Sequence, residues 1–183
     1  MNIRDFDLEL RALTKEDIAI RPFVCDGSPL ECRVFIVGFN PASSVPFWPF
    51  WQPPRGFDKA SWDAEYLRIK GAWSPTRLRI NRLSCALIPY ASCLETNIYS
   101  YPSRDEKSLT ASRRDTRVFE FLLEAVRPAV VLFHGEKATS FGKSLDEHSF
   151  HIKAGKHLRF WRYEAVDAAA EEISSWLKQK AGG

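Results

Sequence analysis

Residues 33–44 read RVFIVGFNPASS, and this stretch decides the fold. Its run of four apolar residues, VFIV, is unbroken, which is typical of a strand covered on both faces, as in a parallel sheet. The run ends at Gly38, and Pro41 cannot continue the hydrogen bonds of a strand. Ligands of open parallel sheets bind beyond the carboxyl ends of the strands. Asn40 therefore stands where such a site is expected, although Asn-Pro is also ordinary turn chemistry.

The composition indicates a single domain over residues 1–183. The chain has 183 residues, of which 45% are hydrophobic, enough for a three-layer core. Its net charge of +3 and pI near 8.7 allow a nucleic-acid or phosphate partner without requiring one. No apolar stretch approaches the roughly 18 residues that span a bilayer, and the charged start MNIRDFDLEL is unlike a signal peptide. We expect a cytoplasmic monomer that does not associate with membranes.

The residues that commonly bind metals are scattered. The four cysteines have none of the CxxC spacings of zinc, iron–sulfur or redox sites, and the four histidines form no HExxH motif. We expect reduced thiols, no metal and no cofactor.

Helical and strand patterns alternate along the chain. Helices are expected around residues 4–13, 58–70, 76–84, 112–126, 136–141 and 164–180, and strands around 33–37, 93–98, 129–135 and 149–154. Asp58 and Ser74, the latter followed by Pro75, are typical of helix starts. Strands separated by helices predict an α/β protein, specifically a three-layer α/β/α sandwich with a central, mainly parallel four-stranded sheet.

Four sequence segments occur in a characteristic order. They are GFNPASS after the first strand, TNIYSYPSRDEKSL after the second, VVLFHGEKA at the third and KHLRF before the last helix. In order, spacing and strand context these segments resemble the uracil-DNA glycosylase superfamily over roughly residues 33 to 180. The closest resemblance is to the mismatch-type uracil/thymine glycosylases and the single-strand-selective branch, whose first motif also carries Gly-x-Asn-Pro. The resemblance implies a DNA glycosylase of base excision repair that flips a deaminated base out of DNA.

Such an enzyme must orient a water molecule and stabilise the negative charge of the departing base. The amide oxygen of Asn40 can position water, but an amide has no useful basicity near neutral pH. By resemblance, Asn40 occupies the water-positioning place, where the fastest uracil-specific enzymes carry an aspartate. By resemblance too, His157 would donate a hydrogen bond to the leaving base. The resemblance brings no lysine for Schiff-base chemistry, so lyase activity is not expected.

Base recognition is expected from the first two strand ends. Gly38 permits close approach of a substrate, and Phe39 follows it. By resemblance, Asn97 reads a base edge, since an amide matches the adjacent carbonyl and N–H of uracil, or of hypoxanthine or xanthine. The aromatic run FWPFW offers Phe47 and Phe50 as stacking rings, and the sequence does not choose between them. His134, at another strand end, is an alternative lining residue of the same pocket.

DNA contacts are expected around this pocket. In the superfamily, the loop that corresponds to His157 continues with a Pro-Ser pair and then an apolar residue, the wedge, which inserts into the DNA duplex. Here the Pro-Ser pair is missing, and the wedge is one of Leu158, Arg159 or Phe160. Candidates for gripping phosphates are Ser43, Ser44, Thr76, Arg77, Arg104 and Lys107.

Two other functions remain open. The missing Pro-Ser pair and the absence of a carboxylate at Asn40 favour a non-catalytic protein that binds nucleic acid or damaged bases on the same fold. The modest net charge would instead suit an enzyme acting on nucleosides or nucleotides.

Overall fold

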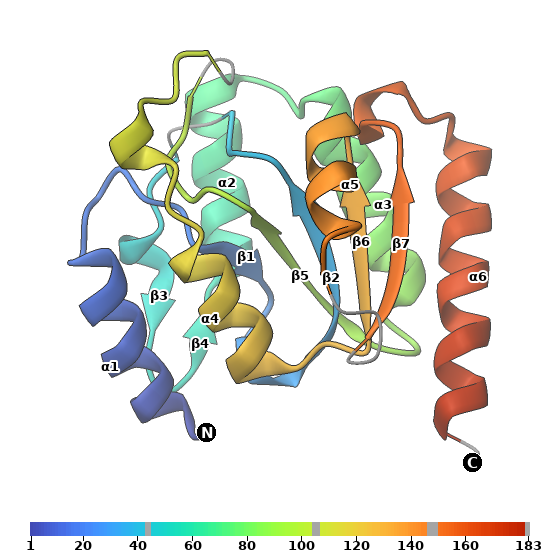
Figure 1. Ribbon diagram of the computed structural model, residues 1–183, viewed down its shortest axis with the longest axis horizontal. Coiled ribbons are helices and arrows are strands. Elements are labelled where there is room, and N and C mark those ends of the chain that lie inside the picture. Colours follow the sequence, from blue (N-terminus) through green and yellow to red (C-terminus); the bar gives the residue numbers. More distant parts are fainter. Residues whose placement is uncertain (43–44, 104–106, 146–149, 182–183) are drawn as a thin grey trace.

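A five-stranded sheet forms the centre of the computed structural model, which describes residues 1–42, 45–103, 107–145 and 150–181 (Figure 1). The strand order is β1-β5-β2-β6-β7. β2, β5, β6 and β7 run parallel, and β1 pairs with β5 in the antiparallel direction. The strands are β1 (Phe23–Cys25), β2 (Cys32–Gly38), β5 (Ser92–Asn97), β6 (Val130–His134) and β7 (His151–Gly155).

The prediction of a mostly parallel α/β sheet is confirmed, but the prediction of four strands is wrong. The additional strand is β1, which lies within a segment, RPFVCDGSP, whose turn residues predict a loop. β1 has only three residues, too few to show a periodic pattern, and it forms by pairing with β5. A separate two-stranded sheet joins β3 (Trp51–Gln52) to β4 (Gly56–Phe57).

Six helices accompany the sheet in the described part of the chain, and several begin at the predicted signals. The Asp58 carboxylate accepts a hydrogen bond from the N–H of Ser61, and the Ser74 hydroxyl accepts one from Arg77. The helix predicted from residue 112 begins five residues later, because a 3₁₀ turn (Ala111–Arg113) precedes it. The helices are α1 (Ile3–Thr14), α2 (Lys59–Lys70), α3 (Pro75–Leu87), α4 (Arg117–Val126), α5 (Glu136–Gly142) and α6 (Tyr163–Ala181).

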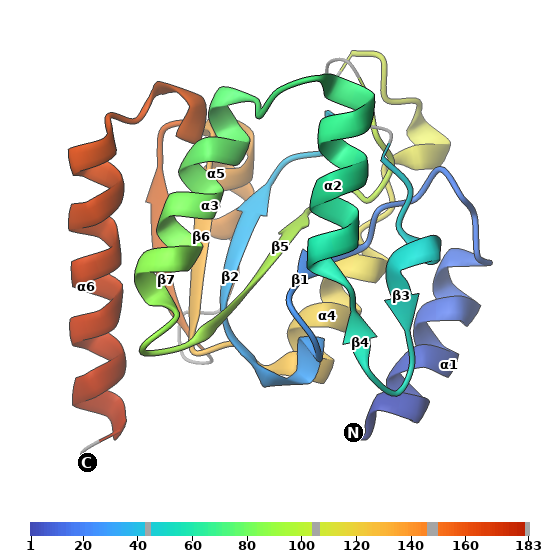
Figure 2. The same cartoon turned by 180° about the vertical axis from the view of Figure 1, so that it is seen from behind.

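Apolar side chains cover both faces of the central strand β2, as its sequence predicts. Val34 and Ile36 pack with residues of α3 and α6, whereas Phe35 and Val37 pack with residues of α1 and α4. All four side chains are fully buried. Figures 1 and 2 show α3 and α6 on one face of the sheet and α4 and α5 on the other.

The connections between strands determine where a cleft can open. The chain leaves β2 over the α3 face to reach β5, and it leaves β6 over the opposite face, through α5, to reach β7 (Figure 2). Neighbouring strands whose connections leave in opposite directions separate at their carboxyl ends, where open α/β sheets bind ligands. In the described residues, we find no helix with the length and apolarity to span a membrane.

Candidate functional site

A cleft of about 810 Å³ lies at the carboxyl ends of β2, β5 and β6. α2, the start of α3, the start of α5 and the turn before α6 complete its walls. All four segments of the sequence resemblance contribute to this lining. The predicted site residues among the lining residues are Gly38, Phe39, Asn40, Thr76, Arg77, Asn97, His157 and Arg159, together with the alternative candidate His134.

Gly38 lets two polar side chains meet over the end of β2. It is in register with Asn97 on β5, and β6 ends at His134 on the other side. A Cβ atom at position 38 would lie 2.6 Å from Asn97 Oδ1 and 3.4 Å from His134 Nε2. Any side chain here would displace the Asn97 amide, so the glycine makes room for this amide at the end of β2.

His134 is buried and electrically neutral. Only 6% of the residue is exposed, and its Nδ1 has no hydrogen-bond partner in the described part of the chain. Burial, together with the nearby His157, lowers the pKa of His134 to about 3. The two imidazole rings are nearly perpendicular, with centroids 4.9 Å apart. The cleft therefore contains both histidines that the sequence offers as candidates.

His157 is oriented by its own backbone. Its Nδ1 accepts a hydrogen bond of 3.2 Å from the N–H of Arg159, so the neutral ring carries its proton on Nε2. Burial and the cation of Arg159 lower the pKa of His157. This arrangement makes His157 a neutral hydrogen-bond donor.

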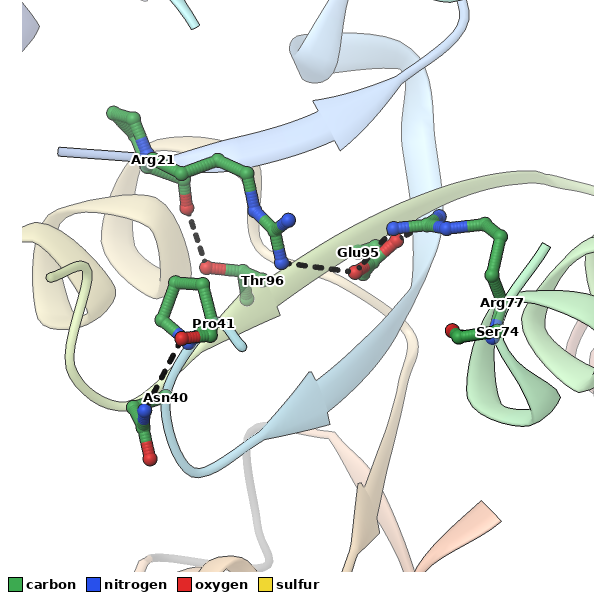
Figure 3. A network of polar contacts seen from close by, with 8 residues as sticks. Arg21, Asn40, Pro41, Ser74, Arg77, Glu95 and Thr96 are labelled. Carbon is green, nitrogen blue, oxygen red and sulfur yellow. Dashed lines mark hydrogen bonds and ion pairs between the residues drawn. The ribbon is translucent and has the colours of Figure 1, made fainter. Parts of the chain in front are cut away.

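Asn40 is held through the nitrogen of its amide. Nδ2 donates to the Ser103 hydroxyl at 2.9 Å, and to the Ser103 and Pro41 carbonyl oxygens at 3.2 Å each. Figure 3 shows Oδ1 directed away from Pro41. Within the described residues, Oδ1 has no hydrogen-bond partner, and it can accept a hydrogen bond from water.

Three buried charges form the inner wall of the cleft (Figure 3). The Glu95 carboxylate lies between two guanidinium groups. Arg77 binds it through both terminal nitrogens, with Nη2 to Oε1 at 2.9 Å, whereas Arg21 reaches Oε1 only at 3.4 Å. The nearby arginines hold the pKa of Glu95 below its usual value against the opposing effect of burial.

Sequence reasoning missed both Arg21 and Glu95. A signal for Glu95 was present, since a carboxylate stands two residues before Asn97 in the strand SCLETN, on the same face. A charge in a buried strand requires partners of opposite charge.

Arg77 differs from its predicted role of gripping phosphate. It is only 4% exposed, and its two terminal nitrogens bind Glu95. A guanidinium held in this way belongs to the inner wall and not to an outer surface that meets a DNA backbone.

The two rings that were expected to stack on the base, Phe47 and Phe50, lie outside the described lining of the cleft. Phe47 is fully buried, stacked on Phe57 with ring centroids 5.2 Å apart. Phe50 is half-buried and meets Phe57 edge-on. Neither belongs to the described lining of the cleft, because burial of these rings anchors their loop in the core. The aromatic rings that do line the cleft are Phe39 and Tyr66.

The three wedge candidates occupy different positions. Leu158 is fully buried in the core with α3 and α6, so it lacks the exposure that a wedge needs. Phe160 is 68% exposed, and the guanidinium of Arg159 lies 4.5 Å from its ring centroid. Arg159 itself lines the cleft.

The remaining phosphate candidates contribute less. Thr76 lines the cleft at the start of α3, whereas Lys107 is exposed and is not part of the described lining. Ser43, Ser44 and Arg104 lie outside the described residues.

Over the described ranges, no three His, Cys, Asp or Glu side chains gather as a metal site requires. Comparison with models of known protein families finds no match for this chain, and comparison with curated proteins finds none either. Its function is therefore inferred from the cleft.

Proposed function

We propose that this protein is a monofunctional DNA glycosylase that hydrolyses the N-glycosidic bond of a flipped, deaminated base, on a three-layer α/β/α sandwich. One observation carries the proposal: Asn40, Asn97 and His157, which come from three separate segments, line the same cleft. Helices on both faces of the sheet support the three-layer arrangement (Figures 1 and 2).

The flipped base would enter beside the end of β2, where Gly38 lets the Asn97 amide and the His134 ring come close to the backbone. Asn97 offers an amide donor and acceptor side by side, matching the carbonyl and N–H of uracil or of a 6-oxopurine. Half-buried Phe39 provides a ring for stacking, whereas the ring of Tyr66 already stacks on Trp73, with centroids 5.1 Å apart. Exposed Phe160 would fill the space that the flipped base leaves in the DNA.

In the reaction, Asn40 Oδ1 accepts a hydrogen bond from the attacking water. The water oxygen bonds to C1′ of the sugar, the bond from C1′ to the base nitrogen breaks, and its electron pair leaves with the base. His157 donates a hydrogen bond from Nε2 to the departing base anion. The proton lost by water passes to solvent, and the released anion takes up a proton from solvent. The products are the free base and an abasic site, and rate enhancement comes from positioning and electrostatics, since Asn40 is no base.

Release of a base from DNA tests the proposal. Oligonucleotides carrying uracil, hypoxanthine or xanthine, single-stranded and paired, are incubated with the protein and treated with alkali to cleave abasic sites. We expect strand breaks, and a loss of roughly a hundredfold or more in rate for Asn40→Ala and for His157→Ala. Arg127→Ala is the control, since Arg127 precedes the amino end of β6, away from the cleft.

The same assay separates the other functions. Binding of the modified oligonucleotides without release of any base would favour a damaged-base binding protein. Turnover of free nucleosides without release from DNA would favour a nucleoside-acting enzyme. Either result would overturn the glycosylase proposal.

A further inference from the structure

The inner wall of the cleft carries an excess of one positive charge. Arg21, Arg77 and Glu95 are 6%, 4% and 8% exposed, so water screens them poorly. Two cations share one carboxylate, and both guanidinium groups approach its Oε1. A buried charge without a full complement of partners is costly. Among the described residues, the wall therefore carries one positive charge that no negative group balances.

In the part of the chain that the structure describes, Arg21 is the cation that lacks a partner of its own. Its single side-chain hydrogen bond within the described residues is the 3.4 Å contact to Glu95, a long one for a charged pair. Burial is the main cause that lowers the pKa of Arg21, and the neighbouring Arg77 lowers it further. Arg21 and Arg77 lie 5.7 Å and 4.9 Å from the ring centroid of Trp62, which contributes only a neutral ring.

We propose that Arg21 forms a subsite for a planar organic monoanion, and that this anion is the departing base itself. The second part rests on the proposed glycosylase function. An excess charge of +1 matches a monoanion, whereas a phosphate dianion would lie against the carboxylate of Glu95. The half-buried ring of Phe39, which also lines the cleft, suits a flat ligand.

The subsite would contribute to catalysis because charge appears only as the bond breaks. When the bond to C1′ breaks, its electron pair stays on the ring nitrogen and spreads to the carbonyl oxygens. A fixed guanidinium stabilises this anion more than it stabilises the neutral base, so it lowers the barrier. His157, being neutral, supplies only a hydrogen-bond dipole.

Binding of free bases tests the subsite without relying on activity. The probes are uracil, neutral at pH 7, and 5-nitrouracil, whose nitro group makes a ring N–H acidic enough that the compound is largely an anion there. By titration calorimetry, we expect the wild-type protein to bind 5-nitrouracil roughly ten- to a hundredfold more tightly than uracil. Arg21→Met should lose this preference, and Arg21→Lys, which keeps the charge, should retain most of it.

Arg82→Met is the matched control, because Arg82 is an exposed arginine paired with Asp167 outside the cleft lining. Thermal unfolding of each variant establishes that it is folded; Arg21→Met leaves Glu95 paired with Arg77. Equal binding of the two probes by the wild-type protein, or an unchanged preference in Arg21→Met, would overturn the subsite. Tighter binding of inorganic phosphate than of 5-nitrouracil would show that the anion is not a base.

Base release from DNA then separates this inference from the glycosylase proposal. With 5-substituted uracils of increasing acidity, we expect Arg21→Met to release the least acidic base most slowly relative to the wild-type protein. An equal slowing for every base would contradict the catalytic role while leaving the glycosylase intact. If the protein prefers the anionic probe but releases no base from DNA, the anion subsite stands. The glycosylase proposal, and with it the identification of the anion as a departing base, would then be wrong.

Discussion

At the residue scale, the buried His134 of the cleft should make the stability of the protein depend on pH. The buried imidazole has a pKa of about 3 against an ordinary value of 6.5. Between these values, the unfolded chain binds a proton that the native state does not. The free energy of unfolding should therefore fall as the pH falls from about 6.5 toward 3, by at most about 1.4 kcal/mol per pH unit, and this loss should be absent above that window.

Urea unfolding at pH 7, 6 and 5 measures this effect in the wild-type protein and in His134→Gln, which cannot titrate. We expect the free energy of unfolding to decline more steeply with falling pH in the wild-type protein. The lowered pKa of His157 makes the free energy of unfolding fall with pH in both proteins. The difference in pH dependence between the two proteins therefore reports on His134. Identical pH dependence would contradict a buried, neutral His134.

The site could be predicted where a residue's role follows from its place at a strand end. Asn40, Asn97 and His157 each stand after or at the end of a strand, and they meet in the cleft because parallel strands end at one edge. Arg21 could not be assigned in this way, because its partner Glu95 lies 74 residues further along the chain. Phe47 was misassigned because an aromatic ring has the same sequence signature whether it stacks on a base or fills the core.

At the scale of the element, the start of α3 supports the inner wall. The Ser74 hydroxyl accepts a hydrogen bond from the N–H of Arg77 at 3.2 Å, and Pro75 opens the helix. Ser74→Ala removes this acceptor and should lower the free energy of unfolding by about 1 kcal/mol. Chemical denaturation measures the loss.

Ser74→Asn, which retains a side-chain acceptor, is the matched control and should unfold close to the wild-type protein. If both variants lost the same stability, the capping hydrogen bond would not be the cause.

Local signals predicted the longer elements better than the short ones. β2 and α2 carry unbroken apolar or capping signals, and their positions agree with the sequence within a residue or two. β1 was missed because three residues are too few to show a strand pattern in the sequence. This strand forms through its pairing with β5, which is distant in the sequence. The first turn of α4 was misplaced because the sequence does not distinguish a 3₁₀ turn from a helix start there.

At the scale of the whole molecule, a net charge of +3 limits how strongly the protein can bind DNA through phosphates alone. Among the residues that the structure describes, the cations at the outer part of the cleft are Lys70, Lys137 and Arg159. Each phosphate contact releases condensed counterions, so the logarithm of the binding constant falls linearly with the logarithm of the salt concentration. With about three contacts, we expect a slope of about −3 on duplex DNA carrying a deaminated base.

Titration of a labelled oligonucleotide at several salt concentrations measures this slope. Arg159→Ala should reduce its magnitude by about one, because Arg159 lies in the cleft lining beside exposed Phe160. Arg127→Ala removes another exposed charge, near the amino end of β6, and it should leave the slope unchanged. Salt-independent binding would contradict phosphate contacts altogether. Equal effects of the two variants would mean that DNA does not approach the protein at the carboxyl ends of the strands. The cleft and the DNA-binding surface would then be separate, and a base flipped from that DNA could not reach Asn40.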